Sequence, residues 1–171
     1  MISDAMATRI SDQINHEFYS AHLYLALSTE AEAMNLRGTA AWFSAKYAEE
    51  MLHADKMIRY LLDQGAEVAF GSIPAPPAKA GAIVPMFERT LAHERGVTAA
   101  INALLDHALS EKDHATGIFL QWFVTEQIEE EATVNDVLGR LRLFGDSGQG
   151  LLMIDNELAA AAKTMGQGGA A

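Results

Sequence analysis

The chain has 171 residues, of which 50% are hydrophobic and 20% are charged, a composition typical of a soluble globular protein. Its formal net charge of −11 argues against a nucleic-acid-binding function, since nucleic acids bind basic surfaces, and suits the attraction of cations. The absence of cysteine excludes disulfides and thiolate metal sites and fits a reducing compartment.

The N-terminal sequence MISDAMATR lacks the basic and then apolar pattern of a signal peptide. No apolar run approaches the roughly 20 residues that a membrane span requires. We therefore expect a cytoplasmic protein that binds neither nucleic acid nor a membrane. The length is that of a single domain, which we assign to residues 1–171.

Apolar residues recur with a helical period in two segments at the start of the chain. The first predicted helix covers about 4–34, and a break at 35–38 separates it from the second, at about 39–64. Gly65 is well placed to end the second helix, because glycine readily adopts the backbone conformation that follows a helix.

The segment 66–83 holds three of the four prolines and cannot continue a helix. A third helix is predicted at about 84–110 and a fourth at about 115–143, with a turn between them. The sequence GDSGQG at 145–150 then precedes a short helix at about 151–163, and we expect residues 164–171 to be disordered.

These elements predict an all-α fold, a four-helix bundle with one long crossover and a short fifth C-terminal helix. Each long helix spans about 40 Å at 1.5 Å per residue. The proline-rich crossover, if extended, reaches roughly 50–60 Å at ~3.1 Å per residue. It is therefore long enough to return along the bundle and start the third helix parallel to the second.

Each of the four long helices carries a polar interruption on its inner apolar stripe, near the middle of its length. These residues are Glu17 in the first helix, Glu50 and His53 in the second, Glu94 in the third, and Gln127 and Glu130 in the fourth. All of them could meet at one level of the core.

Several carboxylates in a dry core repel one another and cost several kcal/mol apiece unless they are neutralised. Protonation, hydrogen bonds or a bound cation can neutralise them, and a doubly charged metal offsets two carboxylates at once. Residues three apart on a helix, as in Glu50-x-x-His53, point the same way. Oxygen ligands with one imidazole suit iron or manganese, and five or six such ligands could hold two ions. The alternative is a buried polar network that only fixes helix register.

A second acidic group comprises Glu49, Glu126 and Glu129. These residues indicate either a solvated face or an adjoining third cation site, and taken alone they favour the solvated face. Tyr24 lies on the inner stripe two turns beyond Glu17 and is typical of a core tyrosine. The remaining histidines have no ligand partner on their own stripe and are interpreted as surface or packing residues; they are His16, His22, His93, His107 and His114. Trp122 is interpreted as a packing residue.

The whole pattern resembles the ferritins, most closely the bacterial non-haem type. The motifs YAEEMLH (47–53) and LQWFVTEQIEEE (120–131) carry this resemblance, which extends from about residue 4 to 163. It implies a shell of twenty-four identical subunits that oxidises Fe(II) with dioxygen or peroxide and stores the product as a ferric mineral.

The resemblance also implies roles for individual residues. Glu17, Glu50, His53 and Glu94 match ligands of a di-iron ferroxidase centre, with Glu50 bridging the irons. Gln127 would lie beside this centre and Glu130 would serve the second iron. Glu49, Glu126 and Glu129, together with Glu130, match a third iron site. Tyr24 matches a tyrosine that can donate an electron.

Two positions depart from related patterns. Bacterioferritins have a second Glu-x-x-His in the fourth helix and bind haem through a methionine; here the fourth helix offers Gln127 and Glu130, so no haem is expected although Met51 matches the methionine. Gly117 and Leu120 stand where many ferritins place acids that line three-fold channels, so the usual iron route is in doubt.

A ferritin-like oxidase that stores no mineral and a non-enzymatic helical scaffold remain as alternatives.

Overall fold

The computed structural model describes residues 2–144 and 147–168, and within these ranges it contains five helices and no strand. This confirms the predicted all-α fold. The helices are α1 (Asp4–Ala33), α2 (Arg37–Asp63), α3 (Ile83–Ser110), α4 (His114–Phe144) and α5 (Gly148–Gly168). None of the described helices is long and apolar enough to span a membrane.

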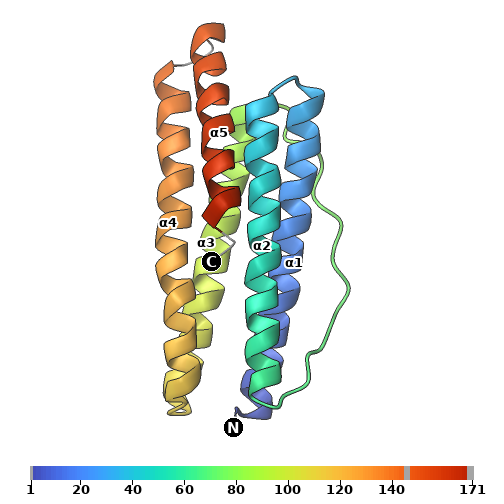
Figure 1. Cartoon of the computed structure of the whole chain (residues 1–171), viewed down its shortest axis with the longest axis vertical. Coiled ribbons are helices and arrows are strands. Elements are labelled where there is room, and N and C mark those ends of the chain that lie inside the picture. The colour runs from blue at the N-terminus through green and yellow to red at the C-terminus, as the bar shows by residue number, and fades with distance from the viewer. Residues whose placement is uncertain (1, 145–146, 169–171) are drawn as a thin grey trace.

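The four long helices form two antiparallel pairs, α1 with α2 and α3 with α4 (Figure 1). The connection between α2 and α3 returns along the outside of the bundle, so that these two helices run parallel. This is the predicted long crossover. It places the mid-points of all four long helices at a similar height.

The turns after α1, α2 and α3 each contain a residue with a positive φ angle. Gly65 has φ 74°, and the N–H of Ala66 reaches back to the carbonyl of Leu61 at 2.9 Å, so Gly65 ends α2 as predicted. The turn between α1 and α2 contains Asn35 at φ 60°, and the turn between α3 and α4 contains Lys112 at φ 58°. Asparagine tolerates this left-handed conformation better than most residues.

The crossover is held against α1 by side chains of that helix. Asn15 donates to the carbonyl of Ala69 at 3.0 Å and accepts from the N–H of Gly71 at 2.8 Å. Near the other end, Glu30 accepts the N–H groups of Ala80 and Gly81 at 3.1 and 2.7 Å. These bonds replace the hydrogen bonds that a non-helical backbone lacks.

The core consists of two apolar clusters with a polar layer between them. One cluster contains Trp42, Phe43, Phe87, Val137 and residues of α5, and the other contains Met6, Ile10, Met57, Leu61 and Phe123. On each long helix the chain passes from one cluster to the other across the polar interruption predicted from the sequence. The prediction that these interruptions share one level of the bundle is therefore confirmed.

The last helix differs from its prediction at both ends. It begins at Gly148 rather than 151, since Ser147 accepts the N–H of Gly150 at 3.3 Å and the N–H of Leu151 at 2.9 Å. It continues to Gly168, whereas the sequence predicted its end at about residue 163; residues 169–171 lie outside the described ranges. Alanines favour helix, and Ala161, Ala162 and Met165 pack against the apolar cluster, which extends α5.

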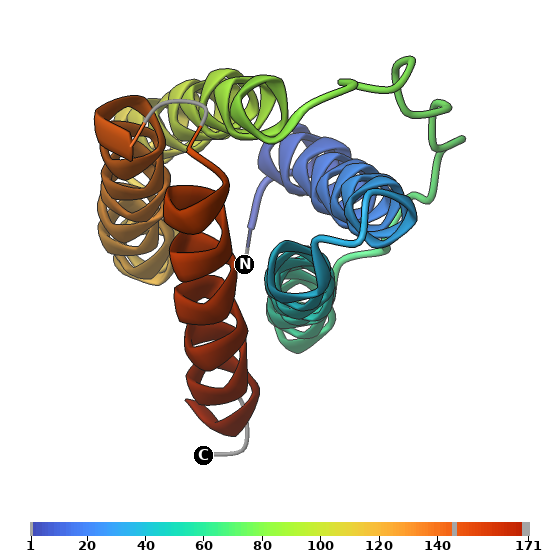
Figure 2. The same cartoon turned by 90° about the horizontal axis from the view of Figure 1, so that it is seen from above.

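Helix α5 leaves the end of α4 and crosses the start of α2 (Figure 2). Asp155 accepts the backbone N–H groups of Gly38 and Thr39 at 2.9 and 2.7 Å and the Thr39 hydroxyl at 2.8 Å. A carboxylate there satisfies the first free donors of α2. Gly38 therefore belongs to the first turn of α2, whereas the sequence predicted it in the preceding break.

Gly38 is the position where α2 and α5 approach most closely. A Cβ atom added there would lie 1.7 Å from the carbonyl oxygen of Asp155, so one backbone must move. We expect Gly38→Ala to lower the thermal midpoint of unfolding by several degrees, consistent with an overpacking cost of about 1–3 kcal/mol. Scanning calorimetry of the two proteins measures this.

Gly96→Ala is the matched control. Gly96 lies in the middle of α3 on its exposed face, and no atom would contact the added Cβ. This change should stabilise the protein by about 0.5–1 kcal/mol, because alanine loses less backbone freedom on folding than glycine does. Equal midpoints for the two variants would contradict the close contact between α2 and α5.

Candidate metal centre

The six polar residues that interrupt the apolar stripes are all buried in the structure. They are Glu17, Glu50, His53, Glu94, Gln127 and Glu130, each with at most 5% of its surface exposed. The prediction that they face the core is confirmed. Their roles as metal ligands remain predictions that the arrangement of their atoms can support.

Three of these residues form a compact set of donor atoms. Glu17 of α1 and Glu50 and His53 of α2 each offer one ligand atom, and these atoms lie within 4.8 Å of one another. His53 Nδ1 lies 3.2 Å from Glu50 Oε2. Gln13 donates to Glu17 Oε1 at 2.8 Å, whereas Glu17 Oε2 is buried without a hydrogen-bond partner.

The ionisation of this set reflects burial and mutual repulsion. Burial raises the pKa of Glu17 well above its ordinary value, and the neighbouring charge of Glu50 raises it further. Burial alone would also raise the pKa of Glu50, but its hydrogen bond to His53 and the positive charges of His53 and Lys46 lower it. In the metal-free protein, Glu17 therefore holds its proton more tightly than Glu50 does.

Glu94 of α3 is also buried and is held by two donors. The Tyr24 hydroxyl donates to Glu94 Oε1, and the Gln127 amide donates to Glu94 Oε2 at 3.1 Å. Burial, together with the charge of Glu130, raises the pKa of Glu94 to about 8. Among the described residues, neither Glu94 nor Glu130 belongs to a three-residue set of donor atoms within 4.8 Å.

Glu130 is paired with a lysine that the sequence interpretation did not include. Lys46 is only 3% exposed, and its Nζ donates to Glu130 Oε1 and, at 2.7 Å, to Glu49 Oε2. Burial raises the pKa of Glu130 to about 7 in spite of this cation, and the other oxygen, Glu130 Oε2, has no partner. Lys46 precedes Glu50 by four residues, so helical spacing alone could have placed it on the inner stripe.

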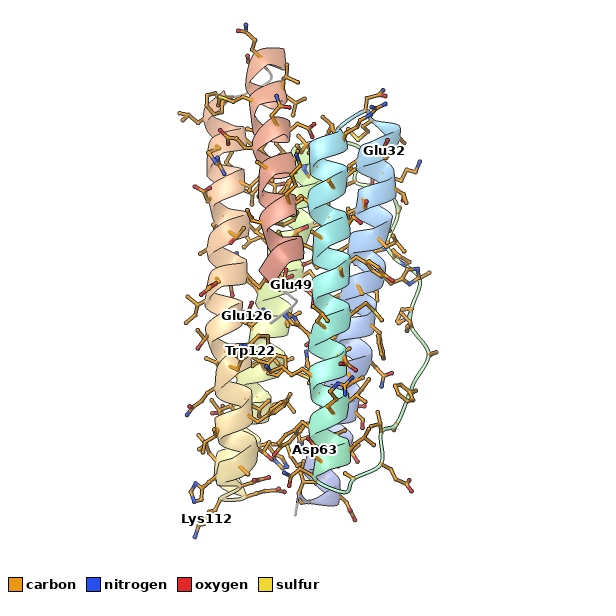
Figure 3. All side chains as sticks on the ribbon, in the orientation of Figure 1. Glu32, Glu49, Asp63, Lys112, Trp122 and Glu126 are labelled. Carbon is orange, nitrogen blue, oxygen red and sulfur yellow. The ribbon has the colours of Figure 1, made fainter. Side chains whose placement is uncertain are left out.

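The second acidic group lies between α2 and α4, where Glu49 and Glu126 are labelled in Figure 3. Donor atoms of Glu49, His53 and Glu126 lie within 4.8 Å of one another. His53 therefore stands between this group and the Glu17–Glu50 pair. Glu129 is exposed and joins neither set, so the structure brings together only part of the predicted third site.

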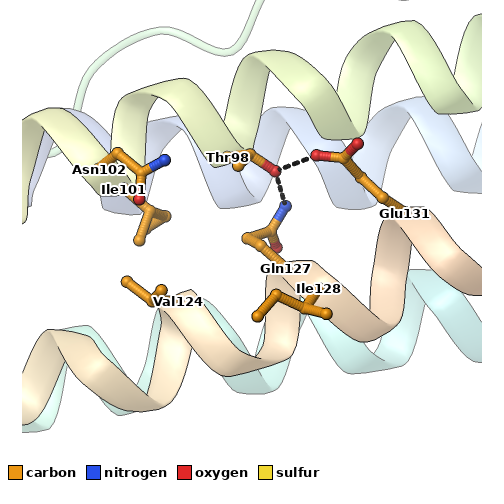
Figure 4. A pocket seen from close by; sticks show the side chains of 7 residues that line it. All are labelled: Thr98, Ile101, Asn102, Val124, Gln127, Ile128 and Glu131. Carbon is orange, nitrogen blue, oxygen red and sulfur yellow. Dashed lines mark hydrogen bonds between the residues drawn. The ribbon is translucent and has the colours of Figure 1, made fainter.

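Gln127 lines a groove between α3 and α4 (Figure 4). Its Nε2 donates to Glu94 and also lies 3.3 Å from Thr98 Oγ1. Thr98 donates to Glu131 Oε1 at 2.7 Å. The other groove residues are mostly apolar, Ile101, Val124 and Ile128 among them. Among the residues that line this groove, Gln127 is the only one of the six buried polar residues of the centre.

Two histidines interpreted as packing residues lie together on the other side of the centre. The rings of His16 and His93 are 5.5 Å apart, and His93 Nε2 is 2.7 Å from the Ser20 hydroxyl. Burial lowers the pKa of His93 to about 4, so the ring is neutral at physiological pH. Trp122 packs edge-on against His53 at 5.5 Å, in agreement with its predicted packing role.

The donor atoms suit a hard metal ion. Glu17 Oε2 and Glu130 Oε2 are buried oxygens without a hydrogen-bond partner among the described residues, and a metal bond would satisfy them. Carboxylate oxygens with one imidazole nitrogen are the ligand types that iron and manganese accept. The fold and this centre define a helical-bundle protein with a buried group of carboxylates and a histidine that could hold a metal ion.

Comparison with known proteins identifies the family. The family model of the ferritin-like domain matches residues 7–144. A probable bacterial non-heme ferritin-like protein of Haemophilus influenzae is 37% identical over 158 residues, covering 92% of this chain and 96% of its own. A bacterial non-heme ferritin of Campylobacter jejuni is 37% identical over 155 residues, covering 91% and 93%.

A solved structure agrees with these sequences. The open pore ferritin of Archaeoglobus fulgidus superposes with a TM-score of 0.92 at 38% identity, covering 93% of this chain and 98% of its own. The chain belongs to the ferritin family, as its motifs predicted, and its relatives include ferritins of the bacterial non-haem type.

The raised pKa of Glu94 makes stability depend on pH in the metal-free protein. Because the folded state raises this pKa from 4.5 to about 8, the folded form binds the proton more tightly than the unfolded chain does. The resulting stabilisation is present below pH ~4.5 and is lost as the pH rises to about 8. In a buffer that contains a chelator, the thermal midpoint of unfolding should therefore fall as the pH rises from ~4.5 to about 8. The variant Glu94→Gln should show a smaller decrease of the midpoint over the same pH range.

Glu88→Gln provides the comparison, since Glu88 is an exposed carboxylate on the same helix. This variant should keep the pH dependence of the parent protein. If Glu94→Gln also kept it in full, another group would be the cause.

Proposed function

We propose that this protein stores and detoxifies iron, oxidising Fe(II) to Fe(III) with dioxygen or peroxide and depositing ferric oxyhydroxide inside a shell of subunits. The observation that carries the proposal is the buried set of Glu17, Glu50 and His53, in which a carboxylate oxygen has no partner in the protein. A bundle that used these residues only for register would pair that oxygen with a donor.

The ferroxidase centre in this proposal holds two iron ions as substrates. Glu17, His53 and Glu94 are terminal ligands, and Glu50 bridges the two ions. The contacts of Glu50 support the bridging role, because its Oε2 lies 3.2 Å from His53 Nδ1 and its charge raises the pKa of Glu17. Glu130 serves the second ion, and Gln127 fixes the orientation of Glu94 through its hydrogen bond.

A third iron binds beside this centre, at Glu49, Glu126 and Glu129 with Glu130. The proximity of Glu49 and Glu126 to His53 supports a site that adjoins the first two. Exposed Glu129 contributes only if its side chain turns inward when the ion arrives.

The ligands determine the direction of the chemistry. Hard anionic oxygens stabilise Fe(III) relative to Fe(II), which favours electron loss to the oxidant. The protons held by Glu17 and Glu94 must leave before these groups bind a metal, so iron binding releases protons near neutral pH. Tyr24 is a further electron donor in this proposal, supported by the direct hydrogen bond from its hydroxyl to Glu94.

The active form in this proposal is a cytoplasmic, twenty-four-subunit cage without haem. Helix α5 crosses the end of the bundle and closes the shell. Gly117 and Leu120 are buried within the subunit and carry no carboxylate. Iron therefore reaches the centre by a route other than an acid-lined channel at these positions.

The test is Glu50→Ala in the assembled protein. We expect a loss of the initial Fe(II) oxidation rate of about 10- to 100-fold or more, because removal of the bridge separates the two ions. The near-ultraviolet absorbance of ferric species after aerobic Fe(II) addition measures the rate. Size exclusion with iron analysis then measures the particle size and the iron retained per subunit.

Asp63→Asn, an exposed change on the same helix, is the control and should oxidise iron at the parent rate. Normal oxidation by Glu50→Ala would remove the proposed ferroxidase centre. A parent protein that oxidised iron but retained only a few ions per subunit would be an oxidase without mineral storage. Absence of oxidation in the parent would leave a structural bundle.

A further inference from the structure

We propose that the Lys46 ammonium group occupies, in the metal-free protein, the position between Glu49 and Glu130 that a metal ion would take, and so weakens the adjoining third site. This inference rests on the proposed function. It makes Lys46 a residue that determines how many ions the centre holds, and for how long. Its basis is the geometry of a single buried cation.

Lys46 is the only lysine or arginine among the buried residues of the described chain. It lies on α2 one turn before Glu50, and its stem passes the Trp42 ring, with Nζ 5.9 Å from the ring centroid. Its ammonium group donates to Glu49 and to Glu130, which come from different helices. Burying a lysine is costly unless its charge is paired, so these two carboxylates hold it in place.

The same two carboxylates are proposed ligands of the third iron. A metal ion and an ammonium group cannot use the same face of a carboxylate oxygen at once. A divalent ion close to a fixed ammonium group would also be repelled, and this repulsion is strong in a poorly solvated core. Iron can therefore bind there only when the lysine side chain moves away.

Lysine is suited to such an exchange. Its charge is compact and sits on a flexible four-carbon stem, which can change rotamer without a change in the backbone. When iron leaves, the ammonium returns and neutralises Glu130, whose second oxygen remains free. The expected result is a third site that accepts iron briefly and releases it. Glu17, Glu50 and His53 keep their ions, because the hydrogen bonds of Lys46 in the described structure go to Glu49 and Glu130 instead.

The experiment is an anaerobic titration of the assembled, metal-free protein with Co²⁺, in which isothermal calorimetry measures the number of bound ions and their affinities. The parent should bind two ions per subunit tightly and a third weakly. Lys46→Met removes the charge and keeps the length of the side chain. It should strengthen the third site by about tenfold or more, the scale of effects from residues that contact metal ligands.

Two further variants separate charge from packing. Lys46→Arg keeps the positive charge and should bind the third ion as weakly as the parent does. Lys56→Met is the matched control, because Lys56 is an exposed lysine of the same helix whose Nζ lies over the Trp122 ring at 3.9 Å. It should leave all affinities unchanged.

A second measurement does not depend on any variant folding. Crystals of the parent soaked in increasing Co²⁺ should show Lys46 displaced from Glu130 wherever the third site is filled. An ion bound to Glu49 and Glu130 with Lys46 still in place would overturn the proposal. So would equal affinity of the third site in the parent and in Lys46→Met.

The two proposals fail in different ways. A parent that bound no ion at Glu17, Glu50 and His53 would overturn the iron function, and with it the role of Lys46. Tight binding of two ions, with an unchanged third site in Lys46→Met, would overturn the role of Lys46 alone.

Discussion

The polar layer through the middle of the bundle is the constraint on which the rest of this structure depends. Four helices bring acidic side chains into a region that water does not reach, and the apolar clusters above and below fix the helices at that height. Hydrophobic side chains at this level would stabilise the fold more than these charged ones do, since buried charges lose their hydration. The layer is therefore understandable as a feature retained for binding rather than for stability.

Without metal, the layer uses three different means of limiting its charge. Glu17 and Glu94 retain protons because burial raises the pKa of each. Glu50 is stabilised by His53, and Glu130 by Lys46. Each means leaves the residue able to bind a cation, because a proton or a side chain can be exchanged for a metal ion. The free protein is thus neutralised by partners that can be replaced.

Much of this arrangement could be predicted from the sequence. Period and spacing placed Glu17, Glu50, Glu94 and Glu130 on inner faces, because each interrupts an apolar stripe of helical period and all four helices repeat the pattern. The crossover was predictable because prolines exclude a helix while the length permits a return along the bundle.

The contacts that decide fine geometry were not predictable in the same way. Asp155 lies far along the chain from Gly38, and no local pattern joins a carboxylate of the last helix to the start of the second. Helical spacing could have placed Lys46 on the inner stripe, but no local pattern shows that its partner is Glu130 of α4. The sequence analysis ended the last helix at about residue 163 and did not predict its extension to Gly168. This extension depends on the packing of Met165 rather than on local composition.

The bond between Asp155 and the first turn of α2 has a consequence for the order of folding. The two partners are separated by 117 positions, so the start of α2 cannot be completed until almost the whole chain has left the ribosome. The pair α1 and α2 can form early from local contacts, but it carries an unfinished helix end during synthesis. Closure of that end reports that α5 has docked, so a chain without its last helix leaves the start of α2 incomplete.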